Sequence, residues 1–484
     1  MGKMDAEKRY RRTVLWIACI GAMMAPLDST IVSVSIPTIA TSLNMDYASI
    51  IWVPTGYLVA LAVLILSMGR LSDIRGRKPI FISGFVIFVV GSFLCSIAQN
   101  GAELIAFRIM QGVGAACFGA TATAIVTDIF PRNERGKALG INAMAVYIGL
   151  SAGPPLGGFL TQAFGWPSIF YINIPIGALV ILLATFKMKE SMLAPKKEKF
   201  DSLGLLTFSI GLIALLVALT VGDMMGWTSL PIVGLFLIAI IFLVAFYLIE
   251  KRLGCRAMLD ITLIMKNRLF ASANVSALLN YTAFFGVSFL ISFYLQKVLG
   301  LSVLDAGLIL LIMPVVMAIL SPFSGLLSDR IGSRALSTFG MILVGVGLLF
   351  MSTLTVSSDT IYVSLGLFVI GLGMGIFASP NTSAVMGAVK KSQLGVASGT
   401  LATMRFVGQA SSLAIMGAIV SSIAGTGVIS SLFIGVGPTS IVSEEFVTGM
   451  SYAFVISALI AFIGAGTSMM RGSHQSNQAK LETT

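Results

Sequence analysis

Two residues of opposite charge stand inside long apolar stretches of the first half of the chain. Asp28 lies in an apolar run from 14 to 36, and Arg108 lies in another from 102 to 126. A charged side chain in hydrocarbon costs about 3 kcal/mol on insertion scales unless it is paired or faces water. A carboxyl group in such a place can bind a proton or a cationic ligand in turn, or it can be a permanent structural partner of an arginine. The predicted chemistry is therefore proton or cation binding, with Asp28 as the acid.

Other chemistries lack the residues that they need. The only histidine is His474, in the polar tail, and no CxxC pair occurs. Three of the four cysteines lie in apolar stretches, where a packing role is expected. The phosphate-binding pattern GxxxxGK[ST] of an ATP-driven pump is absent. The loop 424–445 holds Glu444 and Glu445 without histidine or cysteine, so a membrane enzyme is not indicated. We expect no metal site and no cofactor.

The elements that position these residues are those of a membrane protein. Hydrophobic residues make up 57% of the 484 positions and charged residues 11%, whereas soluble proteins carry about 25% charged residues. A spanning helix needs about 20 apolar residues. Fourteen segments qualify, at roughly 14–36, 50–69, 79–98, 102–126, 138–163, 167–186, 204–222, 229–249, 270–294, 303–327, 336–355, 361–386, 396–423 and 446–470.

The distribution of basic residues tests this count. With a cytoplasmic N-terminus, 28 of the 31 Lys and Arg residues fall in cytoplasmic segments, as the positive-inside rule requires. With a wrong number of spans, the basic residues would be divided between the two sides of the membrane. We therefore expect a multi-pass protein of the cell membrane with both termini in the cytoplasm. The net charge of +11 then reflects topology, and no nucleic-acid partner is expected.

Spans and depth make Arg108 the candidate partner of Asp28. Asp28 lies eight residues before the outer end of the first predicted span, and Arg108 lies six residues into the fourth. Both are thus about 10 Å below the outer surface, at 1.5 Å per residue. Equal depth permits contact without requiring it. Arg405, inside the thirteenth span, either reaches toward the cytoplasmic surface or lines a cavity.

The chain also contains an internal repeat. The segment 69–73 followed by Gly76 recurs as 325–329 followed by Gly332, 256 residues later. Repeated halves are characteristic of secondary transporters, which bind their substrate between the halves. The repeat predicts an all-α membrane protein with two six-helix bundles and two inserted helices. The expected parts are a bundle at 1–187, a cytoplasmic linker with helices seven and eight and a loop at 188–268, a second bundle at 269–471 and a cytoplasmic tail at 472–484.

The first copy of the repeat, GRLSDIRGRK at 69–78, resembles the second-loop signature of the major facilitator superfamily. Gly69 and Gly76 are expected to permit a tight reversal, and Asp73 can face the positive end of a neighbouring helix. The resemblance implies that this neighbour is helix thirteen and that the contact locks the cytoplasmic side. Arg77 is expected to pair with Asp128. The alternative is a basic turn that only sets topology.

A second motif lies in the fifth span. The run GLSAGPPLGG at 149–158 resembles the antiporter signature of exporters in this superfamily. Small residues let helices approach closely, and proline bends a helix. We expect this face to pack on helix eight or ten, while generic small-residue packing is the alternative. The residues concerned are Gly149, Gly153, Pro154, Gly157 and Gly158.

Two further motifs point to one branch of the superfamily. The first-helix segment from Leu27 to Pro37, which contains Asp28, and the fourth-helix segment RIMQGVG, which contains Arg108 and Gln111, resemble those of the fourteen-helix drug/proton antiporters. The resemblance implies the major facilitator fold and assigns proton and substrate coupling to Asp28, Arg108 and Gln111. One departure is Pro167-Ser168, where family members usually carry an arginine and an aromatic residue.

The expected function follows from these motifs taken together. The chain would be a monomeric transporter in the lipid bilayer that exports a small lipophilic, cationic compound by alternating access in exchange for protons. The proton gradient would be the energy source. The alternatives are export of a native metabolite, lipid or siderophore, and a membrane sensor or structural protein that moves nothing.

Overall fold

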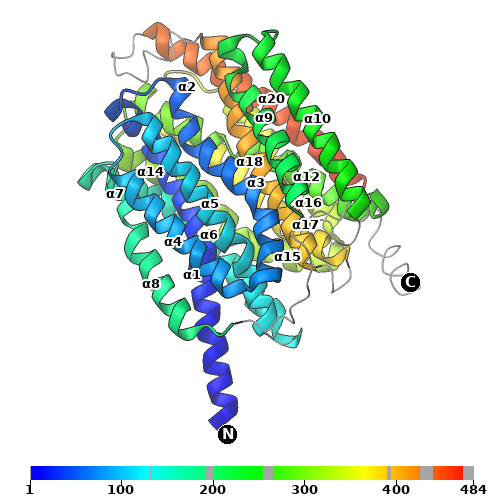
Figure 1. The fold of residues 1–484 in the computed structure, drawn as a ribbon. Coiled ribbons are helices and arrows are strands. Elements are labelled where there is room, and N and C mark those ends of the chain that lie inside the picture. The colour runs from blue at the N-terminus through cyan, green and yellow to red at the C-terminus, as the bar shows by residue number, and fades with distance from the viewer. Residues whose placement is uncertain are drawn as a thin grey trace.

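The computed structural model describes residues 2–130, 132–190, 201–253, 265–389, 394–425 and 440–471. Every regular element in these ranges is helical, and 14 helices are long and apolar enough to cross a membrane. The expected all-α class and the expected fourteen spans are confirmed. The bundle is elongated, and the first turns of α1 extend beyond its other helices (Figure 1).

The first half of the chain provides six spans. Its elements are α1 (Gly2–Ser42), α2 (Tyr47–Ile50), α3 (Trp52–Arg75), α4 (Arg77–Ser96), α5 (Gly101–Ile129), α6 (Arg132–Phe164), α7 (Ser168–Tyr171) and α8 (Asn173–Lys187). Within this half α1 packs on α6, and α5 packs on both α3 and α4.

The second half repeats this plan. Its elements are α12 (Arg268–Phe284), α13 (Val287–Phe293), the π-helix η2 (Tyr294–Val298), α14 (Val303–Leu310), α15 (Ile312–Ile331), α16 (Ser333–Met351), α17 (Thr360–Gly387), α18 (Leu394–Ala424) and α20 (Ser440–Met469). Here α17 packs on α15 and α16, and α20 packs on α16, α18 and α12. The predicted division of the chain into parts at 1–187, 188–268, 269–471 and 472–484 stays a prediction.

Two inserted helices stand beside the seam between the halves. Helix α9 (Ser202–Met225) packs on α10 (Leu230–Leu253) and also contacts α18 and α3. Figure 1 shows this green pair along one side of the molecule. Only 17% of the most apolar window of α10 is buried, so this helix lies at the periphery of the bundle.

The halves meet along several pairs of helices. Helix α3 contacts α18, α1 contacts α13, and α6 contacts α14. Each pair joins a helix of the first half to one of the second, so these contacts surround the axis on which a central site can form.

In each copy of the repeated loop motif, the chain reverses direction at the second glycine. Gly76 has φ +99° and Gly332 has φ +88°, a region that glycine adopts readily and other residues rarely do. Each glycine separates one helix from the next without a linker. The expectation that Gly69 shares this role is wrong, because α3 continues through it to Arg75. Gly69 instead contributes a small surface near Ala120 of α5.

Candidate functional site

The Asp28 carboxylate lies at the centre of a buried polar cluster. Arg108 Nη1 lies 2.5 Å from Asp28 Oδ2, and Asn173 Nδ2 donates to Asp28 Oδ1 at 2.8 Å. Gln111 Nε2 lies 3.4 Å from the same Oδ1. All four residues have a relative exposure of 0%. The charge of Asp28 is thus compensated by one cation and by amide donors, as a buried carboxylate requires.

Arg108 has partners besides Asp28. Its Nε donates to the carbonyl oxygen of Val53 at 3.2 Å, and its Nη1 also donates to Gln111 Oε1 at 2.7 Å. Its guanidinium carbon lies 4.3 Å from the centroid of the Tyr57 ring, within cation–π range. Arg108 therefore retains acceptors and an aromatic face when the carboxyl group of Asp28 is neutral.

Four helices position this cluster. Asp28 comes from α1, Val53 and Tyr57 from α3, Arg108 and Gln111 from one face of α5, and Asn173 from the first turn of α8. Spacing of three residues places Arg108 and Gln111 side by side on their helix. Gly112 lets α5 approach α3, because a Cβ atom there would collide with the Tyr57 carbonyl and Ala60. The site depends on this close approach.

The sequence identifies three members of the cluster and misses others. Asp28, Arg108 and Gln111 are brought together, and Asp28 and Arg108, whose equal depth left contact undecided, form an ion pair. The sequence does not predict Asn173 there, nor Ser92, whose Oγ accepts from Gln111 Nε2 at 2.6 Å. An amide inside an apolar span is a weak signal, since helix–helix hydrogen bonds explain it equally well.

A cavity lies between the two halves. Its volume is about 100 Å³. Seven aromatic side chains line it, together with three methionine or proline side chains of the second half and several small polar groups. The lining residues include Ser29, Thr30, Ser33, Tyr57, Tyr147, Tyr281, Phe284, Phe285, Ser288, Phe289, Met313, Pro314, Met317, Arg405, Phe406 and Gln409.

Tyr57 separates the cavity from the Asp28 cluster. Its ring stacks on Arg108 and also forms part of the cavity wall. Asp28 itself is not among the lining residues. Of the two alternatives for Arg405, the structure shows that it lines the cavity.

The glycine- and proline-rich run of the fifth span has two packing faces. Gly149, Gly153 and Gly157 face α1, and a Cβ atom at Gly157 would lie 2.6 Å from the Ile31 carbonyl oxygen. Gly158 faces α14, where a Cβ atom would lie 2.7 Å from the Val303 carbonyl oxygen, and Pro154 lies against Gly307 of the same helix. Of the two expected partners, helices eight and ten, the tenth is thus correct for Pro154 and Gly158, and helix eight is not their neighbour. The expectation is wrong for Gly153, because the spacing of four residues turns the three glycines toward helix one.

The structure describes only some of the residues that are expected to form a cytoplasmic lock. Arg77 forms an ion pair with Asp128 and donates from Nη1 to the Ala124 carbonyl oxygen at 2.6 Å. The side chain of Asp73 and the residues just before α18 lie outside the described residues. A lock between Asp73 and helix thirteen, with Gly69, Arg77 and Asp128 as its other members, stays a prediction.

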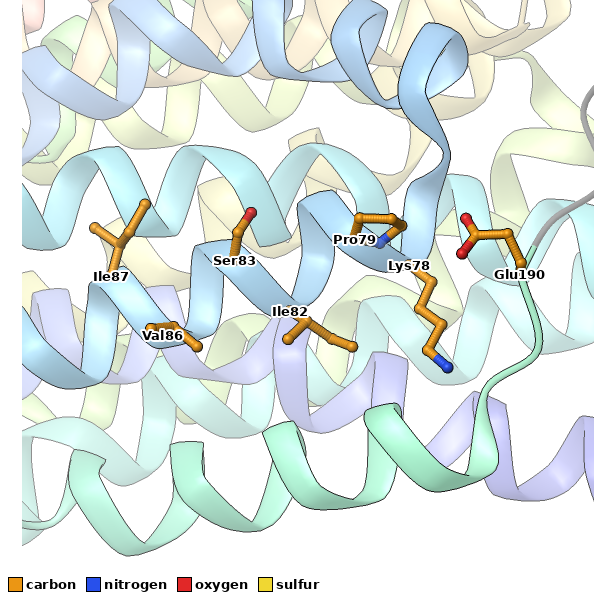
Figure 2. Close-up of a pocket in the computed structure, with 7 residues that line it drawn as sticks. All are labelled: Lys78, Pro79, Ile82, Ser83, Val86, Ile87 and Glu190. Atoms are coloured by element: carbon orange, nitrogen blue, oxygen red, sulfur yellow. The ribbon is translucent and has the colours of Figure 1, made fainter. Parts of the chain in front are cut away.

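A second hollow lies along α4 (Figure 2). It is formed by α4 residues from Lys78 to Ile87 and by Glu190. Lys78 Nζ donates to the carbonyl oxygens of Thr185 and Met188, at 2.8 and 2.7 Å. The lysine therefore caps the end of α8, and this hollow has a structural explanation.

Within the described residues, no group of three or more His, Cys, Asp or Glu side chains is placed to hold a metal ion. Cys19, Cys95 and Cys117 are buried free thiols. Asp28, with one arginine and two amides around it, is arranged to hold a charge or a proton.

Comparisons with known proteins give one consistent family. A family model described as Major Facilitator Superfamily matches residues 18–413 and 273–471. The riboflavin transporter RibZ of Clostridioides difficile is 36% identical over 81% of this chain and 84% of its own. Multidrug resistance protein 3 of Bacillus subtilis is 31% identical over 87% of this chain and 82% of its own. A bacterial homologue of the human lysosomal transporter Spinster, in an inward-facing structure, has a TM-score of 0.68 at 16% identity, with 98% of each chain covered. The last likeness concerns the fold alone.

Proposed function

Because the chain belongs to the Major Facilitator Superfamily, we propose that it exports small lipophilic compounds from the cell in exchange for protons, with Asp28 as the proton-binding group. The family establishes a multi-pass membrane transporter. The proposal adds direction, coupling and substrate class, and it takes the protein to act as a monomer with no cofactor besides the proton gradient.

One observation carries the proposal. A fully buried carboxylate, paired with one arginine, lies behind the wall of a cavity between two repeated halves. Protonation of Asp28 would remove the anion that compensates Arg108 and leave a buried cation without its counterion, which is unfavourable. Rearrangement of the helices that hold the pair would relieve this cost. A proton can in this way bias the protein between two arrangements.

The cavity wall supports a lipophilic substrate. Apolar side chains, with aromatic rings and methionines among them, line most of it, and such surfaces accept varied apolar compounds. The multidrug resistance protein of Bacillus subtilis among the relatives agrees with this class. The described residues of the wall include no carboxylate that could pair with a cationic substrate. The proposed substrate class is therefore defined by lipophilicity and not by charge.

A second candidate is export of a native aromatic metabolite. It is favoured by the 36% identity to a protein named as a riboflavin transporter and by the same aromatic wall, which suits a planar ring system. Efflux of riboflavin from loaded proteoliposomes, compared with efflux of lipophilic drugs, separates the two candidates.

The proposed coupling is tested by Asp28→Asn. The variant keeps the shape of the side chain and cannot ionise, so we expect efflux driven by an imposed pH gradient to fall by about tenfold or more in proteoliposomes, with downhill movement retained. Asp28→Glu should retain part of the activity. Asp359→Asn, an exposed helix cap where asparagine serves equally well, is the matched control. Normal gradient-driven efflux by Asp28→Asn would show that the proton path lies elsewhere.

A further inference from the structure

Arg405 brings a formal charge into the cavity. It lies on α18, and its guanidinium carbon is 5.1 Å from the centroid of the Tyr281 ring. Tyr281 is buried and belongs to the same wall. Among the lining residues that the structure describes, Arg405 is the only one that carries a formal charge. The electrostatics of the cavity are therefore those of a single cation.

This cation has no acceptor among the described residues. There Arg405 forms no ion pair and no hydrogen bond, and its Nε is buried without a partner. A guanidinium group has five N–H donors, and an unsatisfied donor removed from water is costly. The ring of Tyr281 offers an attractive face but no lone pair in the guanidinium plane. The donors at that edge are free for a ligand.

The buried acid cannot fill this role. Asp28 is fully enclosed and already engaged by Arg108, Asn173 and Gln111. It belongs to the opposite half of the molecule and is not part of the cavity wall. Arg405 thus differs from Arg108, whose charge is compensated within the protein.

The surroundings of Arg405 define the rest of the ligand. Gln409 lies one turn further along α18, on the same face, and also lines the cavity. Its side chain has a donor and an acceptor. Across the cavity Tyr147 of α6 presents a phenol whose oxygen accepts from Ser321 Oγ at 3.1 Å. Aromatic rings thus surround a short polar stretch that contains one cation.

We propose that this cavity binds an aromatic compound that carries a carboxylate or a similar anionic edge, and that Arg405 binds this edge with Gln409 beside it. Guanidinium and carboxylate groups fit each other through two parallel hydrogen bonds. The aromatic part of the compound would pack on Tyr281 and the phenylalanines. This inference rests on the proposed transport function and names its substrate class as anionic aromatic compounds, opposite in charge to the cationic compounds expected from the sequence.

Equilibrium binding of two dyes tests the proposal without any gradient. Fluorescein and rhodamine 6G share a three-ring xanthene core with a pendant phenyl ring, and near neutral pH the first is anionic and the second cationic. Binding to the full-length protein in lipid nanodiscs is measured by fluorescence anisotropy, with empty nanodiscs subtracted. We expect the wild-type protein to bind fluorescein about tenfold more tightly than rhodamine 6G.

Variants at position 405 assign the preference. Arg405→Gln should weaken fluorescein binding about tenfold and leave rhodamine 6G binding within about twofold. Arg405→Lys keeps the positive charge but lacks the planar guanidinium group. Its affinity for fluorescein should lie between those of the wild type and Arg405→Gln. Arg252→Gln, on the exposed end of α10, is the matched control and should bind both dyes as the wild type does. Thermal melting of each variant reports whether it is folded. The preference of the wild-type protein for fluorescein is measured without any variant, so it tests the proposal even if a variant fails to fold.

Several results would overturn the proposal. These are equal binding of both dyes by the wild type, tighter binding of rhodamine 6G, no binding of fluorescein, and unchanged fluorescein binding by a folded Arg405→Gln variant. The dye-binding results do not depend on proton-coupled efflux, so they would still hold if no proton coupling were found in proteoliposomes. The proposed function and the proposed substrate class can therefore fail separately.

Discussion

At the residue scale, three donors share one carboxylate. Arg108, Gln111 and Asn173 approach Asp28 from two helices. A buried ion pair contributes little net stability, because desolvation offsets most of the attraction, but removing one partner is costly. Net stability alone therefore does not explain the cluster, in keeping with the proton-binding role proposed for Asp28.

Asn173 provides a graded test of this cluster. Asn173→Ala removes the amide that donates to Asp28 Oδ1 at 2.8 Å and leaves the Arg108 pair in place. A hydrogen bond to a charged group contributes about 1.5–3 kcal/mol. We expect gradient-driven efflux to fall severalfold, less than in Asp28→Asn. The initial efflux rate in proteoliposomes measures it.

The control for Asn173→Ala is Asn274→Ala. Asn274 is also a buried amide in a spanning helix, but it donates to the Phe270 carbonyl oxygen of its own helix. Its loss should leave the efflux rate close to that of the wild type. A wild-type rate in Asn173→Ala would exclude this amide from the proton site.

The sequence predicts the ionised members of the site but not all of the neutral ones. A charge in an apolar span is rare enough to identify a functional residue by itself, which is why Asp28 and Arg108 can be found without a structure. Asn173 and Ser92 carry no such signal, because polar uncharged groups occur throughout these spans. Tyr57 shares a site with Arg108 only because α3 and α5 meet at Gly112, which depends on tertiary packing.

At the element scale, α6 is a joint between three helices. Its glycine face packs on α1, which carries Asp28, and its Pro154–Gly158 face packs on α14 of the other half. If α1 moves during transport, we expect α6 to carry that movement to the second half. The run of small residues is visible in the sequence, whereas the assignment of its two faces requires the relative rotation of the helices.

Gly153 tests this joint. A side chain at that position would overlap Thr30 and come within 3.0 Å of the Ile31 backbone nitrogen, and overpacking typically costs about 1–3 kcal/mol. We expect Gly153→Leu to separate α6 from α1, lower the melting temperature and abolish coupled efflux. Gly140→Leu, on the same helix, should behave as the wild type, because a Cβ atom there would have no described neighbour within 4 Å. Full coupled activity of Gly153→Leu would contradict the close-packed joint.

The loop repeat shows where local reasoning succeeds. Gly76 and Gly332 hold corresponding positions in the two copies, and both have the positive φ values of a turn. Gly69 belongs to the same motif, yet it lies within a helix and makes no turn. The π-helix η2 has no sequence signal at all. A widened turn of this kind arises from tertiary contacts and often marks a functional site.

At the scale of the whole molecule, an even number of spans places both termini on one side of the membrane. The basic residues indicate that this side is the cytoplasm. A single cysteine at Ser473 in a Cys-less variant should therefore react with a membrane-impermeant maleimide only after the cells are opened. A single cysteine at Gln99, in the loop between α4 and α5, should react in sealed cells. Reaction at Ser473 in sealed cells would refute the fourteen-span topology.

A small set of hydrogen bonds joins α1 to the second half at the end of the bundle that is predicted to face outward. Ser292 Oγ and Gln296 Nε2 donate to the Val34 carbonyl oxygen at 3.2 and 2.8 Å, and Lys297 Nζ donates to Thr41 Oγ1 at 2.9 Å. Gln296 and Lys297 belong to η2, while Val34 and Thr41 belong to α1. The π-helical turn thus presents two donors to the helix that carries Asp28.

These bonds predict how the outer side opens. Gln296→Leu removes one donor from the Val34 carbonyl, a loss of about 1 kcal/mol that changes a two-state population about fivefold. Ser33 lines the cavity next to Val34, so a single cysteine at position 33 in the Cys-less variant reports outward opening. We expect its labelling by an external, membrane-impermeant maleimide to become several times faster in Gln296→Leu. Gln99→Leu removes an exposed outer glutamine that makes no such contact and should leave the rate unchanged. If both variants label at the wild-type rate, the contact between η2 and α1 does not hold the outer side closed, and the packing of α6 on α14 must do so instead.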